Sequence, residues 1–332
     1  MNKIRVAVVG VGHLGRFHAE KFAQIPQVEL VGIVDVVKER ADEVARRCHT
    51  RPFYDFREVL PLVDAVSVVV PTVHHFNVTK AALEAGCHAF VEKPLASTPQ
   101  EARQLVKLAE ELGLILQVGH IERFNPAIKK LLAEVRDPLF IEAQRVSRFS
   151  SRCLDVDVIL DLMIHDLDLI LAITSSPVEE LQAAGAPVVT DKIDLASVRL
   201  RFKDGIVANL TASRIALKPA RSFRVYQPGA YLAADTLEST FVKVALEEGR
   251  FTEASPPLPE KFPGADPLRE ELEIFIEAIK SGHTPPVSGE DGFEALELAF
   301  RIKKEIERQK DLFLAREGSC LPDLRRHCVS SS

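Results

Sequence analysis

Short apolar runs rich in β-branched residues alternate with amphipathic stretches over roughly the first third of the chain. The amphipathic stretches have the spacing of helices that cover the faces of a parallel sheet, so the pattern predicts successive βαβ units. A helix over Pro99–Leu112 has well-marked ends, because Ser97 and Thr98 precede it and Gly113 follows it. The six predicted strands lie near Ile4–Val9, Glu29–Asp35, Arg51–Phe53, Ala65–Val70, His88–Glu92 and Leu114–Val118.

The pattern changes after residue 120, where helices are followed by several longer strands in which apolar and polar residues alternate. The runs Leu195–Phe202 and Ile206–Arg214 predict a β-hairpin, since Asp204-Gly205 between them suits a tight turn. The other predicted elements are a helix from about Asn125, a strand over Leu139–Arg148, a helix from Asp157, a Pro-rich loop over Ser255–Pro267, and helices near Leu268–Ser281 and Glu290–Glu307.

We therefore predict an α/β chain of two domains. The first, residues 1–121, has a Rossmann parallel sheet, and the second, residues 122–308, is an α+β domain with a mostly antiparallel open sheet. Residues 309–332 show no clear period and are predicted to form a tail that can be flexible.

Composition and charge narrow the classes of protein. A length of 332 residues, with 46% hydrophobic and 27% charged residues, is typical of two globular domains. The net charge of -6 gives no positive field to attract nucleic acid or an anionic membrane. No apolar run approaches the roughly 18 residues of a membrane span, and the first residues lack the pattern of a signal peptide. Five scattered cysteines fit reduced thiols. We expect a cytoplasmic protein with a small-molecule substrate, and no nucleic-acid, membrane or metal partner.

The segment Gly10–Gly15 reads G-x-G-x-x-G and stands between the first predicted strand and a helix. There, Gly10, Gly12 and Gly15 allow a tight turn, close approach of a pyrophosphate, and close packing of the helix on the sheet. His13 and Leu14 lie between these glycines and are assigned to the same cofactor site. A structural glycine turn without a ligand is the alternative.

The second predicted strand ends in Asp35, twenty residues after Gly15. A carboxylate in this place can accept hydrogen bonds from both ribose hydroxyls of an adenosine, and it would repel a 2′-phosphate. NAD is therefore favoured over NADP. Lys38 and Arg40 follow the strand closely and leave NADP open, since cations accommodate that phosphate.

The predicted helix that begins at Asp157 is apolar nearly all round. At about 100° per residue, one narrow stripe carries the polar residues Asp157, Asp161, His165 and Asp168. A helix this apolar should be buried, so the stripe needs a polar cavity or compensating cations, and we predict a cavity. His165 can take the proton of an alcohol as hydride leaves, oriented by Asp161 one turn earlier. The alternative is a hydrogen-bonded interior histidine.

The tripeptide Glu92-Lys93-Pro94 ends the fifth predicted strand, at the carboxyl edge where such sheets bind ligands. Lys93 could polarise the reacting oxygen or carry its proton, and Pro94 could hold an unusual backbone turn. Alone, the tripeptide is an ordinary loop. His74 and His75 have no carboxylate or cysteine in metal-ligand spacing, so they predict no metal site.

In their order and spacing these motifs resemble the glucose-fructose oxidoreductase, inositol dehydrogenase and MocA family, along nearly the whole chain to about residue 308. The resemblance implies a dehydrogenase acting on a CH-OH group, with Lys93, Asp161 and His165 as catalytic residues. It also implies dimers or tetramers formed through the open face of the second sheet. The cofactor contacts that it implies are Pro71, Thr72, His75, Glu92 and Lys93. The matching motifs are the glycine loop with His18 after it, Pro71–His75, Glu92-Lys93-Pro94, the pair Asp161 and His165, and Glu290-Asp291-Gly292.

Two segments, Gly119–Pro126 and Asp161–Leu169, are similar to the UDP-N-acetylglucosamine 3-dehydrogenase branch of this family. That similarity implies that Arg123 and Asn125 line the substrate pocket beside the catalytic residues. Met163 stands where many relatives have glycine, which makes free polyols less expected substrates. Clustered basic groups suit a diphosphate, and the candidates are Arg148, Arg152, Arg214, Lys218 and Arg221. For any single one of them, a solvated surface cation is the alternative.

The resulting expectation is NAD-dependent oxidation of C3 of UDP-N-acetylglucosamine, in the biosynthesis of amino sugars for lipid A or surface polysaccharide. The nearest alternative is the same chemistry on a free sugar, a sugar acid or an inositol. An alternative of another class is a non-catalytic NAD-binding regulator, because a Rossmann fold alone does not determine function.

Overall fold

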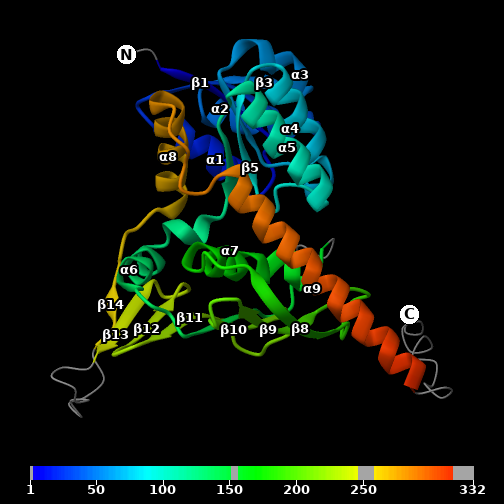
Figure 1. The fold of residues 1–332 in the computed structure, drawn as a ribbon. Coiled ribbons are helices and arrows are strands. Elements are labelled where there is room, and N and C mark those ends of the chain that lie inside the picture. Colours follow the sequence, from blue (N-terminus) through cyan, green and yellow to red (C-terminus); the bar gives the residue numbers. More distant parts are fainter. Residues whose placement is uncertain (1–2, 151–155, 246–257, 317–332) are drawn as a thin grey trace.

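The computed structural model describes residues 3–150, 156–245 and 258–316, with the side chains beyond residue 309 left out. Two domains are stacked, each built on one sheet (Figure 1). No helix in the described part of the chain is long and apolar enough to cross a bilayer.

The first sheet is parallel throughout, as predicted, and its strand order is β3-β2-β1-β4-β5-β6. The order reverses between β1 and β4, which places the ligand-binding crevice of a Rossmann fold at the carboxyl ends of these strands. Both faces of β1 are buried, because Val6 and Val8 pack on one side and Ala7 and Val9 on the other. The strands are β1 Ile4–Val9, β2 Val28–Val34, β3 Arg51–Phe53, β4 Ala65–Val68, β5 His88–Glu92 and β6 Leu116–Gly119. Helices α1 Gly15–Phe22, α2 Lys38–Arg47, α3 Phe56–Val59, α4 His75–Glu84 and α5 Pro99–Leu112 connect them, with short 3₁₀ turns at η1 Leu60–Leu62 and η2 Thr72–His74.

Helix α5 has the ends that the sequence predicts. The Thr98 hydroxyl accepts a hydrogen bond from the Glu101 backbone N–H at 3.2 Å, and the Glu101 carboxylate accepts one from the Thr98 N–H at 3.1 Å. This is a capping box, and Gly113 ends the helix at a φ of 64°.

Replacing Thr98 by Ala should lower the free energy of unfolding by about 1 kcal/mol, because one backbone N–H of the first turn loses its acceptor. Chemical denaturation measures the change. Thr98→Ser, which keeps the hydroxyl, should unfold like the unaltered protein, and an equal loss in both variants would contradict the capping role.

The second sheet has strand order β14-β13-β12-β11-β7-β10-β9-β8 and is antiparallel except where β10 runs parallel to β7. The predicted hairpin is confirmed, with Gly205 in its turn at a φ of 90°. Helices α6 Pro126–Glu134 and α7 Ile164–Ile173 lie on the side of this sheet that faces the first domain (Figure 1). The strands are β7 Phe140–Val146, β8 Val178–Ala186, β9 Leu195–Phe202, β10 Val207–Ser213, β11 Ala220–Gln227, β12 Ala230–Asp235, β13 Thr240–Ala245 and β14 Glu260–Lys261.

The last two helices return to the first domain. Helix α8, Pro267–Ser281, packs on α1, where Phe275 meets Phe90 of the first sheet edge to face at 5.8 Å between ring centroids. The sequence interval places α8 with the second domain, yet its apolar face covers the first sheet. Helix α9, Gly289–Arg316, begins against α5 and β6 and then crosses α7 and β8 (Figure 1). It runs beyond the predicted end at Glu307, into the interval predicted as a tail. Residues 317–332 of that tail lie outside the described residues.

Candidate active site

The glycine loop has the shape that a dinucleotide needs. Gly10 has a φ of 87°, and a Cβ on it would lie 2.7 Å from the Val69 carbonyl oxygen. A Cβ on Gly15 would lie 1.9 Å from the Gly10 carbonyl oxygen, so only glycine lets α1 start this close to β1. A Cβ on Gly12 would meet no atom within 4 Å. That open space lies at the N-terminus of α1, where a pyrophosphate would approach, and the loop therefore fits the dinucleotide.

Asp35 follows β2 at the same edge and is 6% exposed. Its carboxylate accepts hydrogen bonds from the backbone N–H groups of Val11 at 3.0 Å and Val37 at 2.9 Å. A guanidinium nitrogen of Arg40 lies 3.5 Å away, and this side chain is half exposed. Asp35, which would accept hydrogen bonds from the ribose hydroxyls of NAD, is thus adjacent to Arg40, which would bind the 2′-phosphate of NADP.

The other predicted cofactor residues line this edge, with one difference in role. His13 and Leu14 are exposed on the glycine loop, and Pro71 and Thr72 begin the turn after β4. His75 is 1% exposed, and both of its ring nitrogens face carbonyl oxygens, Pro94 at 2.7 Å and Val70 at 2.9 Å. These contacts connect the loops after β4 and β5 through the His75 ring, so the structure favours a structural role for this predicted cofactor residue. Burial lowers its pKa despite the two carbonyls.

Glu92 belongs to a buried chain of polar groups that the sequence did not reveal. Its carboxylate lies 3.1 Å from Nε2 of His18 on α1, and Nδ1 of His18 lies 3.0 Å from the Ser67 hydroxyl. The other carboxylate oxygen accepts from the Lys93 backbone N–H at 3.2 Å. Burial by itself raises the pKa of Glu92, but the His18 contact and the Lys93 charge outweigh burial and hold it below its ordinary value. His18 was visible only as part of the family motif.

Lys93 reaches from the first domain to the helix that carries the predicted base. Its ammonium donates to the Asp161 carbonyl oxygen at 2.7 Å and lies 3.4 Å from the Asp161 carboxylate. The peptide bond between Lys93 and Pro94 is cis. Lys93 and Asp161 are 17% and 22% exposed, so the pair is accessible at the boundary between the domains.

His165 lies one turn beyond Asp161 and is partly exposed, while its Nδ1 is buried without a hydrogen-bond partner among the described residues. Burial and the positive charges of Lys93 and Arg145 lower its pKa well below 6.5. The imidazole is therefore neutral at neutral pH, as a proton acceptor must be. Within the described chain Asp161 contacts Lys93 and makes no hydrogen bond to His165, so the predicted orienting contact is absent from this structure.

The polar stripe of this helix meets cations instead of the predicted cavity. Residues Ile159–Met163 form a π-helical turn before α7, which shifts the regular spacing. Asp161 faces Lys93, and each other carboxylate has its own cation. The pairs are Asp157 with Lys303 at 2.7 Å and Asp168 with Arg123 at 2.7 Å, and Asp166, which lies outside the stripe, pairs with Arg145 at 2.8 Å.

The two residues expected to line the substrate pocket are occupied by contacts within the chain. Arg123 holds Asp168 through two guanidinium nitrogens and reaches Asp291 at 3.2 Å. Asn125 caps α6 by accepting from the Ala127 N–H at 3.0 Å, and it donates to the Thr236 carbonyl oxygen at 3.2 Å. These contacts favour structural roles for both side chains, and their contact with substrate stays a prediction.

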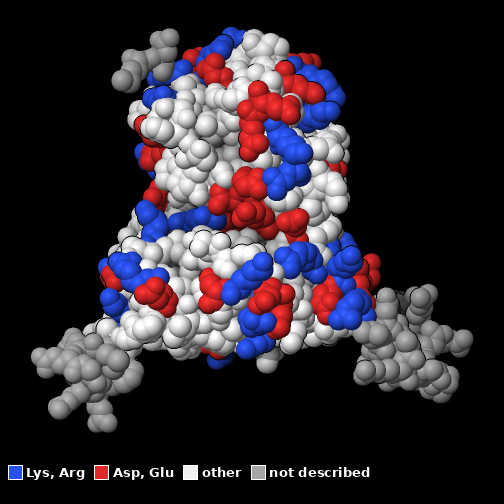
Figure 2. Space-filling model, viewed as in Figure 1, with Lys and Arg blue, Asp and Glu red and all other residues white. Residues whose placement is uncertain are grey.

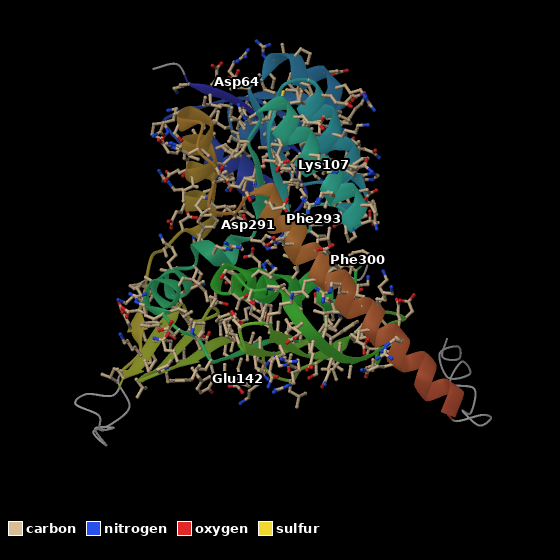
Figure 3. The ribbon with its side chains drawn as sticks, viewed as in Figure 1. Asp64, Lys107, Glu142, Asp291, Phe293 and Phe300 are labelled. Atoms are coloured by element: carbon tan, nitrogen blue, oxygen red, sulfur yellow. The ribbon has the colours of Figure 1, made fainter. Side chains whose placement is uncertain are left out.

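Asp291 joins this junction from the first turn of α9. Figure 3 places it between the two domains, and Figure 2 shows acidic side chains gathered at the height where α9 begins. A Cβ on Gly292 would lie 2.4 Å from Val118, so the glycine of the Glu290-Asp291-Gly292 motif brings α9 against β6. The motif therefore aligns Asp291 with Arg123.

The candidate diphosphate cations differ in their surroundings. Arg148 donates to the Leu217 carbonyl oxygen at 3.0 Å, and Arg214 is buried with a contact of 2.6 Å to the Val156 carbonyl oxygen. Lys218 is exposed, and Arg152 lies outside the described residues. Arg221 is 41% exposed and 3.8 Å from Glu122, and its charge acts on His165. Among the described candidates, Arg221 is the one whose positive charge lowers the pKa of His165, the predicted base.

A buried cluster around Arg145 escaped the sequence interpretation. Arg145 is 3% exposed and bonds Asp166 on α7 and Glu122 on the 3₁₀ turn η3, Ile121–Phe124. Burial opposes the charged guanidinium, but the two carboxylates raise its pKa. Burial raises the pKa of Asp166. The cluster ties the second sheet to the helices beneath the site. No trio of potential metal ligands was found among the described residues.

Two protein-family models match the chain in succession. Residues 4–120 match the model of an oxidoreductase family with an NAD-binding Rossmann fold, and residues 128–229 match the GFO/IDH/MocA C-terminal domain. The chain belongs to the GFO/IDH/MocA oxidoreductase family. It is therefore a nicotinamide-dependent oxidoreductase acting on CH-OH groups, and the predicted fold and family are confirmed.

Two relatives align with this member of the GFO/IDH/MocA family over almost their full length. A UDP-N-acetylglucosamine 3-dehydrogenase from Acidithiobacillus ferrooxidans is 40% identical, covering 92% of this chain and 98% of the relative. A myo-inositol 2-dehydrogenase from Thermotoga maritima is 32% identical, covering 94% and 98%. A solved structure of a UDP-N-acetylglucosamine 3-dehydrogenase from Acidithiobacillus ferrooxidans superposes with a TM-score of 0.86 at 39% identity, covering 93% of this chain and 99% of that one.

Proposed function

We propose that this protein oxidises the C3 hydroxyl of UDP-N-acetylglucosamine to a ketone with NAD. The observation that carries the proposal is the meeting of Lys93, on the cofactor edge of the first domain, with Asp161 one turn before the neutral His165. The 40% identical relative of that activity supports the choice of sugar. The 3-keto product would serve amino-sugar biosynthesis, for lipid A or surface polysaccharide.

The side chains divide the work of proton transfer and charge stabilisation. His165 accepts the hydroxyl proton, since its surroundings keep the imidazole neutral. The Lys93 ammonium stabilises negative charge on the reacting oxygen, and Asp161 fixes the position of that ammonium. Bound NAD supplies the two-electron acceptor for the alcohol carbon. Arg221, half exposed near His165, is our candidate contact for the diphosphate.

Asp35 supports NAD as the natural cofactor, because a 2′-phosphate beside this buried carboxylate would be repelled. Asp35→Ser should shift the ratio of kcat/KM for NADP over NAD upward by about tenfold or more, since the repulsion disappears and Arg40 stays. Steady-state kinetics with both cofactors measures the ratio. Asp42→Ser removes a carboxylate of α2 that bonds the Tyr54 hydroxyl and should leave the ratio unchanged. An unchanged ratio in the Asp35 variant would argue against its role in selecting the cofactor.

The test of the proposed reaction is the formation of reduced nicotinamide, followed by its near-ultraviolet absorbance. Purified protein is mixed with NAD and UDP-N-acetylglucosamine, with an aminotransferase and amine donor to remove the ketone. Signal with the nucleotide sugar, and none with free N-acetylglucosamine or myo-inositol, supports the proposal. Signal with myo-inositol or a free sugar alone moves the substrate to the alternative class, and NAD binding without any turnover supports the regulator.

We also infer that the protein acts in the cytoplasm as a homodimer or homotetramer joined through the outer face of the second sheet. That face carries an aromatic row, with ring centroids 5.9 Å apart for Phe140 and Tyr226 and 5.1 Å apart for Tyr226 and Tyr231. Glu142, which accepts from the Tyr226 hydroxyl, marks the same outer face in Figure 3. Light scattering gives the copy number, and a monomer at all concentrations would reject this inference.

A further inference from the structure

Two histidine rings touch inside the molecule, and three of their nitrogens have no hydrogen-bond partner among the described residues. His120, which follows β6, is 0% exposed, and its ring meets that of His165 edge to face with centroids 6.3 Å apart. Both ring nitrogens of His120 and Nδ1 of His165 are buried and unpartnered. Buried polar groups are nearly always hydrogen-bonded in native proteins, so this arrangement needs a partner of its own.

Further buried polar atoms without a partner among the described residues belong to Glu271 and Gln117. Both carboxyl oxygens of Glu271 on α8 and the Oε1 of Gln117 on β6 are buried without a partner in the described structure. The Gln117 amide donates to the Glu271 carbonyl oxygen at 3.1 Å, which brings these two residues together. Glu92 and Asp168 act electrostatically on both Glu271 and His120. We name His120, Gln117 and Glu271 the buried polar cluster, since buried polar groups without a protein partner are where proteins retain ordered water.

We propose that His120 and a bridging water store a proton for His165 during turnover, an inference that rests on the proposed function. The hydroxyl proton moves to the ring nitrogen of His165 on the substrate side. Nδ1 of His165 then gives its own proton through the water to His120. When the product has left, the stored proton returns from His120 to Nδ1 of His165 by the same route, and His165 then releases the substrate-side proton to solvent. One proton per turnover reaches solvent, and both rings return to their starting state.

The charges around the two rings favour this direction of transfer. Burial lowers the pKa of both histidines. The side chains that act on His165 are, in order of effect, the cations Lys93 and Arg145, then His120, and then Arg221, and each opposes a positive ring.

His120 has mixed surroundings instead. Asp168 and Glu92 favour a positive ring there, whereas Arg123 and Lys93 oppose it. A bound substrate would exclude solvent from His165, so His120 offers its proton a place while the site is closed.

The test compares two replacements of His120. His120→Phe keeps the ring contact and removes both nitrogens, and His120→Gln can bond the water but cannot carry a proton. Both should lower kcat by about tenfold, with KM and NAD affinity unchanged, because general acid-base groups typically contribute at least that factor. Both should also increase the solvent deuterium isotope effect on kcat, since the release of the His165 proton becomes slower.

The outcomes are distinguishable. Unaltered kcat and isotope effect in both variants, or full recovery in the Gln variant, would overturn proton storage and leave His120 a packing residue. If the Phe variant fails to fold, the Gln variant decides alone. The control is His88→Phe. His88 begins β5, whereas Glu92 of the candidate site ends that strand, so this variant should keep the kcat of the unaltered protein. Failure of the unaltered protein to oxidise any sugar would reject the proposed function together with the storage, whereas an active unaltered protein isolates the storage.

Discussion

Replacing His165 by Asn is expected to lower kcat for sugar oxidation by about 10²- to 10⁴-fold, the range that a positioned general base contributes. Asn has a similar polar shape but cannot accept a proton at neutral pH. The site around it should survive, since Lys93 holds Asp161 through a backbone carbonyl oxygen that the substitution leaves in place. Absorbance of reduced nicotinamide gives kcat, and calorimetry gives the affinity for NAD, which should be unchanged.

The matched control is His283→Asn, on the exposed loop after α8. It should leave kcat and NAD binding as they are in the unaltered protein. Turnover that persists in the His165 variant would remove His165 as the base and move the search to Lys93.

Replacing Lys93 by Met should lower kcat by about 10²- to 10³-fold, because the ammonium that stabilises negative charge on the reacting oxygen is gone. The same change should move the acid limb of the pH profile. In the unaltered protein the lowered pKa of His165 keeps the base neutral below pH 6.5, so kcat/KM declines only at more acidic pH. Without the positive charge of Lys93 the pKa of His165 rises, and the decline should begin at higher pH.

A profile of kcat/KM from about pH 5 to pH 9 in the Lys93 variant measures this shift. Lys107→Met is the control, because Lys107 is exposed on α5, away from the junction of the domains (Figure 3). An acid limb that stays in place when Lys93 is replaced would show that its charge is not felt at His165.

Elements with local signals could be predicted closely from the sequence. Helix α5 is one example, because Thr98, Pro99 and Gly113 mark its ends within the segment itself. Strands β1, β4 and β5 of the first sheet were recognisable because their apolar residues are buried on both faces, whereas the short β3 is largely exposed. The order of the glycine loop, Asp35 and Glu92-Lys93-Pro94 then placed the candidate site at one edge of the sheet.

Pairings between distant segments could not be predicted. A polar stripe on a buried helix is compatible with a cavity or with cations, and the cations that meet it, Lys93, Arg123 and Lys303, come from three other parts of the chain. The π-helical turn at Ile159–Met163 also breaks the regular period on which the stripe was drawn. His120 lies in the Gly119–Pro126 segment, but the sequence assigned it no role there, and the contact with His165 is what singles it out.

The return of α8 to the first sheet limits how the chain can be divided. A fragment that stops at residue 121 would lack the ring of Phe275 against Phe90 and would present a bare apolar surface to water. A newly synthesised chain faces the same situation, because its first domain stays incomplete until residue 281 has been made. A chimera with a relative should therefore take two separate segments, the Rossmann sheet and α8, from the same parent protein.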